Sequence, residues 1–260
     1  MFQPFPMLPR RRAQAWRHQP QYRRPRHFHR EPEFNLVVRG SCTVGMGTRK
    51  VALAAGEFVV FAPGQDHVLV DHSDDFDLFV VALTPELAER VLGTRAVLPC
   101  GASAFTANAL ARSVEQLEAL GTTSDAAAVE RELGELFASV LSGSPRGHVL
   151  SRRAASAIAA EPDLSEAALA ARFHATPSDI SRHFRHDLGL TLVEHRARMR
   201  LMAFVAAVER GASLTSAAFS SGFGSYAQCH RVFRRLLEQS PRNYFDGGRE
   251  LLANSTVAEP

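Results

Sequence analysis

Apolar and polar residues alternate over short stretches in the first third of the chain, and turn residues bound each stretch. The strands that this alternation predicts are 34–38, 41–44, 51–53, 58–61, 67–70 and 76–82. Glycine or proline stands in the turns between them, as in Arg39-Gly40 and Pro63-Gly64. Many short strands at close spacing predict an all-β sandwich or barrel. We expect about fourteen residues before it to form a flexible arm.

The spacing of the apolar residues changes to a helical period from Thr84 onward. Leu110, Val114 and Leu117 recur at i, i+4 and i+7, and a similar stripe runs over 129–141. These stripes predict helices over 103–120 and 126–141, which either pack on the barrel or form a dimer interface. The run 142–147 is a linker candidate, and the chain beyond it predicts six or seven short helices and no strand.

The helical half repeats itself at an offset of 49 residues. Arg-His-Phe-Arg at 182–185 returns as Arg-Val-Phe-Arg at 231–234, and each copy closes a unit of short helix, tight turn and second helix. In the first unit Thr176 is expected to cap the second helix, with Pro177 at its first position. In the second unit Gly222 can supply the turn.

Two such units are typical of DNA-binding proteins in which a second helix enters the major groove. Arg182 and Arg231 suit bidentate contacts with guanine, and Arg185 and Arg234 lie a turn later, nearer to phosphate. A plain helical bundle with arginines on a solvated face is the alternative, and the matching pair of units disfavours it. The side chains expected to contact DNA are Ser178, Ser181, Arg182, Arg185, Tyr226, His230, Arg231 and Arg234.

Residues 150–245 resemble the tandem helix-turn-helix domain of AraC-type bacterial transcription regulators. The matching features are Leu164-Ser165 with Ala170, Ser181-Arg182-x-Phe184-Arg185, Gly189-Leu190-Thr191, Arg196, Arg198, Arg200-Leu201, Gly222-Phe223, Arg231-Val232-Phe233-Arg234 and Ser240-Pro241-x-x-Tyr244. The resemblance implies that two recognition helices enter adjacent major-groove segments about 34 Å apart on one face of DNA.

Three positions of the second unit depart from the family pattern toward smaller side chains. Ala217 stands where isoleucine is usual, Ser221 where valine is common, and Cys229 where the family has a large aromatic residue. Each change removes apolar volume and costs on the order of 1 kcal/mol if a cavity is left. We therefore expect a looser second unit with weaker readout of bases.

The β-rich part carries a second resemblance, to the two cupin motifs. The motif residues are, in order, His27-x-His29-x-x-x-Glu33-x-x-x-x-x-x-Gly40, then Gly56, then Pro63-Gly64-x-x-His67. The glycine that precedes the first motif is missing, and Asp71 stands where the second motif ends in asparagine. Cupin-like sensor domains precede the DNA-binding domain in many AraC-type regulators, so the resemblance implies a sensor barrel here.

Four residues of this motif have side chains that bind metals: His27, His29, Glu33 and His67. Three imidazoles and one carboxylate suit divalent Fe, Mn, Zn or Ni. His27 and His29 are two positions apart, which places them on one face if they lie on a strand. The alternative is that the same polar groups line a metal-free ligand pocket.

Composition and charge add limits to this picture. The 260 residues are 45% hydrophobic and 22% charged, which is ordinary globular usage and excludes a disordered chain. The chain has three cysteines, Cys42, Cys100 and Cys229, which lie far apart in the sequence. Because their number is odd and their spacing is wide, neither a disulfide framework nor a cysteine metal site is expected. Neither a secretory signal nor a membrane segment is apparent, and we expect a cytoplasmic protein without a membrane partner.

The net charge is +3, and all of this excess lies in 149–260, because residues 1–148 hold equal numbers of basic and acidic side chains. Its sign fits DNA, although its size is small. Arginine supplies 29 of the 30 basic residues, a bias that codon usage in a GC-rich genome also explains. The basic groups at 10–12 and 23–26 are expected to be a solvated arm or strand edge rather than contacts to DNA or an acidic effector.

The expected fold has two domains, an all-β cupin-like barrel followed by helices and then an all-α domain. The expected boundaries are 1–84 for the sensor barrel, 85–148 for a helical region, 149–250 for the tandem helix-turn-helix domain and 251–260 for a tail. We expect a sequence-specific transcription regulator controlled by a small-molecule effector in the barrel, binding promoter DNA as a homodimer and contacting RNA polymerase if it activates. The alternatives are a metal-dependent cupin enzyme with a helical appendage, and a regulator whose barrel is purely structural.

Overall fold

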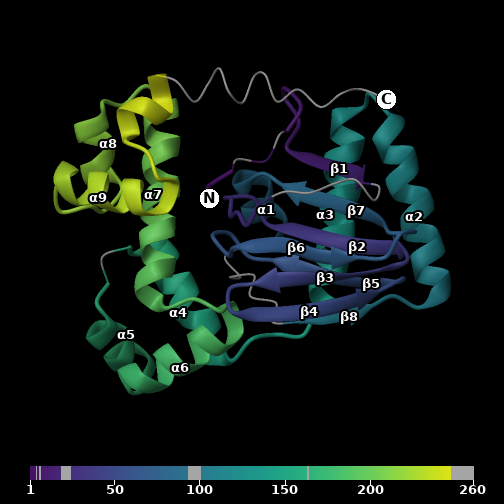
Figure 1. Cartoon of the computed structure of the whole chain (residues 1–260), viewed down its shortest axis with the longest axis horizontal. Helices are drawn as coiled ribbons and strands as arrows, with labels where there is room; N and C mark the ends of the chain where they lie inside the picture. The colour runs from purple at the N-terminus through teal and green to yellow at the C-terminus, as the bar shows by residue number, and fades with distance from the viewer. Residues whose placement is uncertain (4, 6, 19–24, 93–100, 163, 247–260) are drawn as a thin grey trace.

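The computed structural model describes the chain except for residues 4, 6, 19–24, 93–100, 163 and 247–260. Cys100, part of the basic group at 23–26 and the tail expected at 251–260 lie outside the described residues. Two antiparallel sheets and their covering helices form the N-terminal part, and a helical part follows it (Figure 1). This is the β-barrel and all-helical arrangement that the sequence predicts.

The strands form one larger and one smaller sheet. The five-stranded sheet has the order β1 (Ala13–His18), β7 (Asp77–Leu83), β2 (Glu33–Arg39), β5 (Glu57–Phe61) and β8 (Ala102–Ala104). The three-stranded sheet has the order β4 (Arg49–Ala54), β3 (Ser41–Met46) and β6 (His67–His72). The six predicted strands are present as β2 to β7, whereas the alternation did not reveal β1 or β8.

The five-stranded sheet is buried on both faces, and successive residues of each strand serve different cores. On β2, Phe34 and Leu36 pack toward the covering helices, while Val37 packs into the space between the two sheets. Every residue of β7 is buried for the same reason. Glu33 and Asn35, which share a face with Val37, therefore direct polar groups into the interior of the barrel.

Three helices cover the outer face of this sheet. They are α1 (Pro85–Leu92), α2 (Ala107–Thr122) and α3 (Ala126–Gly143). The apolar stripes of α2 and α3 belong to the same core as Phe34, whose ring centroid lies 5.3 Å from that of Phe137. Of the two expectations for these stripes, packing on the barrel is the one that the structure shows.

Among the described residues of the remaining part there are six helices: α4 (Val149–Ala160), α5 (Glu166–Phe173), α6 (Pro177–Leu188), α7 (Leu192–Glu209), α8 (Leu214–Ser220) and α9 (Tyr226–Leu237). The pairs α5–α6 and α8–α9 lie at opposite ends of the long helix α7 (Figure 1). Ile180 and Phe184 are buried in one apolar core, and Cys229 and Phe233 in another. None of the described helices has the length and apolar character that crossing a membrane requires.

The first residues of the chain are packed against the protein, which differs from the flexible arm expected there. Phe2 is only 3% exposed, and its backbone forms an isolated β-bridge with that of Phe28. The carbonyl oxygen of Phe28 accepts a hydrogen bond from the N–H of Gln3 at 3.0 Å. The basic group at 10–12 also contacts the rest of the protein, because Arg12 forms an ion pair with Glu130 of α3 at 2.8 Å. Burial of the aromatic ring of Phe2 favours this packing over a solvated arm.

Candidate DNA-binding surface and buried histidine cluster

Local signals fix the turn and the second helix of the first unit. His174 follows α5 with a left-handed backbone (φ 51°), which turns the chain toward α6. Thr176 caps α6 by accepting a hydrogen bond from the N–H of Asp179 (3.1 Å), and Pro177 takes the first helical position. The left-handed Gly189 (φ 73°) ends the helix. The start of α6 thus agrees with the cap and proline predicted from the sequence.

The side chains predicted to contact DNA from α6 lie on its surface side. Ser178, Arg182 and Arg185 are exposed, and Ser181 is half-buried. The Arg182 side chain is 65% exposed and forms an ion pair with Asp179, one helical turn earlier, at 2.6 Å. This pair orients the guanidinium beside the N-terminal end of α6, the end that a recognition helix presents to base edges.

The second unit presents its predicted side chains in the same way. Gly222 has a left-handed backbone (φ 81°) in the turn, and Ser225 caps α9 by accepting the N–H of Gln228 at 3.1 Å. Gln228 in turn accepts the N–H of Gly224 at 2.8 Å, a bond that the sequence alone did not indicate. Exposed or half-buried on α9 are Tyr226, His230, Arg231 and Arg234.

The three small residues of the second unit are all buried in its core. Ala217 and Cys229 are fully buried, and Ser221 is nearly so. Phe2 and Phe28 from the N-terminal part belong to the same apolar cluster as Ala217 and Cys229. The core of the second unit is thus continuous with apolar side chains of the N-terminal part.

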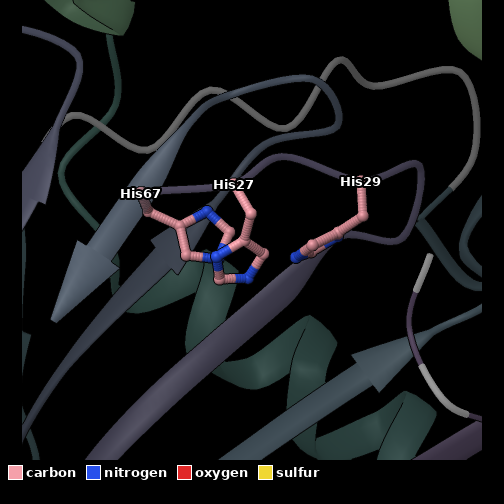
Figure 2. Close-up of side chains that lie close together, drawn as sticks. All are labelled: His27, His29 and His67. Atoms are coloured by element: carbon pink, nitrogen blue, oxygen red, sulfur yellow. The ribbon is translucent and has the colours of Figure 1, made fainter. Parts of the chain in front are cut away.

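The four residues of the cupin-like motif lie together in the interior of the barrel. His27 and His29 belong to an irregular segment before β2, rather than to the regular strand that their spacing suggested, and His27 forms an isolated bridge with His67. Glu33 begins β2 and His67 begins β6. All four side chains are buried. One ring nitrogen from each histidine lies within 4.8 Å of the other two (Figure 2).

Burial and proximity determine the charge of this cluster. Burial, followed by the nearby His67, lowers the pKa of His27 to about 3 and keeps its ring neutral. Burial alone would raise the pKa of Glu33, but the adjacent rings of His67 and His29 hold it well below its usual value. The cluster therefore combines a neutral imidazole with a carboxylate that is ionised at neutral pH.

The cavity beside the cluster is small. Its volume is about 30 Å³, and His27, Glu33 and His67 line it together with Asn35 and Cys42. A volume of this size accommodates about two water molecules or a single ion. Burial raises the pKa of the Cys42 thiol to about 12, so this side chain contributes a neutral S–H.

Comparison with known families decides the class of this protein. A family model described as the AraC-like ligand binding domain matches residues 12–141, which is half of the chain. A second model, described as a helix-turn-helix domain, matches residues 169–247. The chain is an AraC-type transcription regulator. It is a DNA-binding regulator with a ligand-binding N-terminal domain, in a family of regulators rather than enzymes.

Solved structures are similar in fold to this AraC-type regulator over most of the chain. ToxT from Vibrio cholerae O395 is similar at 12% identity and a TM-score of 0.50, over 94% of this chain and 98% of that one. Unsaturated fatty acid bound wild-type ToxT from Vibrio cholerae strain SCE256 has the same identity and TM-score, over 95% and 97%. No curated protein matches the sequence.

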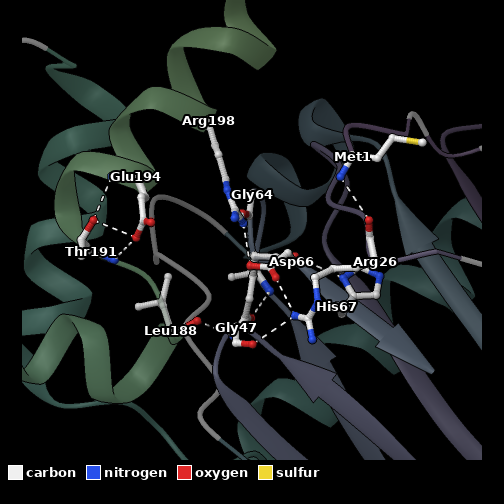
Figure 3. A network of polar contacts seen from close by, with 12 residues as sticks. Met1, Arg26, Gly47, Gly64, Asp66, His67, Leu188, Thr191, Glu194 and Arg198 are labelled. Atoms are coloured by element: carbon white, nitrogen blue, oxygen red, sulfur yellow. Dashed lines mark hydrogen bonds and ion pairs between the residues drawn. The ribbon is translucent and has the colours of Figure 1, made fainter. Parts of the chain in front are cut away.

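A polar contact that no sequence pattern indicates joins the two domains of this AraC-type regulator. Asp66, buried directly before β6, accepts a hydrogen bond from Arg26 at 2.7 Å and one from Arg198 of α7 at 2.8 Å (Figure 3). Arg198 also donates to the carbonyl of Gly64 at 2.9 Å, and its guanidinium lies 4.8 Å from the centre of the Phe28 ring. Asp66 and Arg198 are 132 positions apart, so no local pattern could pair them.

Proposed function

We propose that this AraC-type regulator reads a promoter sequence with α6 and α9. The observation that carries the proposal is that both helices present exposed arginines on the surface side of a helix-turn-helix unit. Arg182 and Arg231 suit bidentate hydrogen bonds to guanine, and Arg185 and Arg234 suit phosphate. Further contacts with DNA are expected from the other surface side chains of the two helices, Ser178, Ser181, Tyr226 and His230.

Equilibrium binding to a DNA fragment selected for affinity tests this proposal. We expect the full chain to bind that fragment at least a thousandfold more tightly than a shuffled fragment of equal length. Affinity for both fragments should fall steeply with salt, because each neutralised phosphate releases counterions. Equal affinity for the two fragments would contradict sequence-specific recognition.

The proposal includes control by a small effector bound inside the barrel. The match of residues 12–141 to a ligand-binding domain supports an effector in this part of the chain. The cavity beside the histidine cluster, of about 30 Å³, suits an ion or a few atoms. A ligand such as the fatty acid bound to ToxT is larger than this cavity.

We also predict a homodimer, and a contact with RNA polymerase if the protein activates transcription. The apolar stripes of α2 and α3 are buried against the sheet, so a dimer through these helices would use their outer faces. Sedimentation of the full chain over a range of concentrations checks the dimer. A mass of one chain at every concentration would contradict it.

A further inference from the structure

A large groove lies between the two domains, outside the barrel. Its volume is about 1810 Å³, and helices α1 and α3 of the N-terminal part line it together with α4 and α7 of the helical part. Pockets for small molecules usually measure about 300–1,000 Å³. Two apolar side chains in the lining, Val91 and Val149, are 36% and 42% exposed. The groove therefore has both the room and the exposed apolar surface for a segment of another protein.

Small side chains form much of the groove on the helical side. On α7, Met199, Ala203 and Ala206 line it at i, i+4 and i+7, and on α4, Ser156 and Ala159 do so three positions apart. Ala203 and Ala159 are exposed, so the described chain does not cover them. Side chains at these spacings share one face of a helix. Two such faces of small residues let the backbone of a third helix approach closely, as in proteins that bind a helix in a groove.

The charge of the groove is positive. Three glutamates and six arginines line it, and the arginines are Arg30, Arg146, Arg152, Arg153, Arg172 and Arg210. Arg172 pairs with Glu161 at 2.7 Å, and Arg30 lies 3.7 Å from Glu209. The other four arginines form no ion pair with any described residue. A surface with this excess of positive charge attracts and orients an acidic partner.

Two buried polar atoms of the lining lack a partner. His195 is 4% exposed, and its Nδ1 has no hydrogen-bond partner among the described residues. The same holds for Nε of Arg152 on α4. Both residues line the groove. Buried polar atoms in folded proteins are nearly always hydrogen-bonded, so these two atoms indicate an occupant that supplies the missing bonds.

We propose that this groove binds an acidic amphipathic helix of a partner protein. The apolar face of the partner helix packs on the small residues of α4 and α7, and its carboxylates pair with the arginines that have no ion pair in the described chain. The groove has walls from both domains, so the bound helix fixes how the domains are arranged and thereby changes DNA binding. This consequence for DNA rests on the proposed function, whereas the docking itself does not.

Selection of peptides from a displayed library, with the full chain as bait, tests the docking without DNA. The peptides have about 16 residues, enough to form a helix. We expect the enriched peptides to combine an apolar stripe with an excess of aspartate and glutamate. They should bind Arg153→Glu and Ala203→Trp at least tenfold more weakly than the wild type. Arg131→Glu on α3 and Ala119→Trp on α2 make the same changes at exposed positions outside the groove and should bind like the wild type.

The groove variants alter different helices and different properties, so each tests the docking even if the other fails to fold. No enriched peptide, or enriched peptides that bind wild type and groove variants equally, would overturn the proposal. Binding of decanoate, a small anionic amphiphile, that Ala203→Trp abolishes while no peptide is enriched would also overturn it. The occupant would then be a small molecule.

DNA affinity measured with and without a saturating enriched peptide tests the consequence for the regulator. We expect wild-type affinity for a selected fragment to change at least threefold, and Arg153→Glu to show no change at the same peptide concentration. Peptide binding with unchanged DNA affinity would overturn the link between the groove and DNA. Absence of specific DNA binding in either state would instead contradict the proposed function and leave the docking site standing.

Discussion

At the scale of single residues, the recognition arginines and the buried histidines carry most of the chemistry. The side chains that we predicted on the two recognition helices are all exposed or half-buried, because helical spacing fixes which side of α6 and α9 each one takes. The inward position of Glu33 follows from the alternation along β2 in the same way. The irregular path of His27 and His29 could not be predicted, since it depends on a bridge to His67 forty residues later.

The first prediction at this scale compares the two recognition helices. We expect Arg182→Ala to weaken binding to a selected fragment more than Arg231→Ala, with losses of about 1–3 kcal/mol for a bidentate contact to a base. The reason is that small side chains build the core below Arg231. Fluorescence anisotropy at fixed salt measures both losses. Arg131→Ala, which removes an exposed arginine from α3, is the control, and equal losses for the first two variants would refute the ranking.

A second prediction concerns His195, which is buried on α7 beside Phe184. Burial, then the charges of Arg198 and Arg196, lowers the pKa of His195 to about 4 from the usual 6.5. Unfolding lets the ring take a proton at mildly acidic pH. The stability that the neutral ring contributes is therefore complete above pH 6.5 and is lost as the pH falls toward 4, by about 1.4 kcal/mol per unit.

Urea unfolding at pH 7.5 and pH 5.0 measures this contribution. The wild type should lose more free energy of unfolding between the two values than His195→Phe, which has no titrating ring. The other titrating groups are common to both proteins, so the difference between them isolates His195. An equal loss in the two proteins would contradict the assignment.

At the scale of elements, periodicity revealed most of the fold. Apolar stripes and caps predicted the helices that the structure shows as α2, α3, α5, α6, α8 and α9, and turn residues bounded the strands. The strands β1 and β8 have no clear alternation, and they exist because they pair with β7 and β5. Pairing across a sheet is a long-range effect that local sequence does not encode.

The second helix-turn-helix unit gives the prediction at this scale. Phe2→Ala should lower the stability of the protein by about 3 kcal/mol, because it leaves a cavity in the core shared with Ala217 and Cys229. Thermal unfolding measures this loss. Leu8→Ala, at an exposed position of the same segment, should change the melting temperature little. An unchanged melting temperature for Phe2→Ala would show that the segment does not support the second unit.

At the scale of the whole molecule, the two domains meet through specific contacts. The glycines Gly47 and Gly189 lie so close that a side-chain carbon on Gly47 would be 2.6 Å from the Gly189 carbonyl oxygen. Gln65 donates to the carbonyl of Leu188, next to Gly189, at 3.4 Å. Together with the pair of Asp66 and Arg198, these contacts join the end of the barrel to the C-terminal end of α6 and to α7.

These contacts predict that the domains stabilise each other. Gly47→Ala should weaken the contact with Gly189, because the added methyl group has no space and the backbone there is left-handed (φ 54°). We expect a lower melting temperature and altered DNA affinity in this variant. Gly121→Ala, at a helix position with open space around it, is the control. Equal behaviour of the two variants would contradict a close contact between the domains.

The central claim is that α6 and α9 each read part of one DNA site. Selection of bound DNA from random sequence, with the wild type and with Arg182→Ala and Arg231→Ala in parallel, tests it most directly. We predict two enriched blocks centred about one helical turn apart, with each variant losing preference in a different block. No enriched sequence with the wild type, or loss of the same block in both variants, would contradict the account.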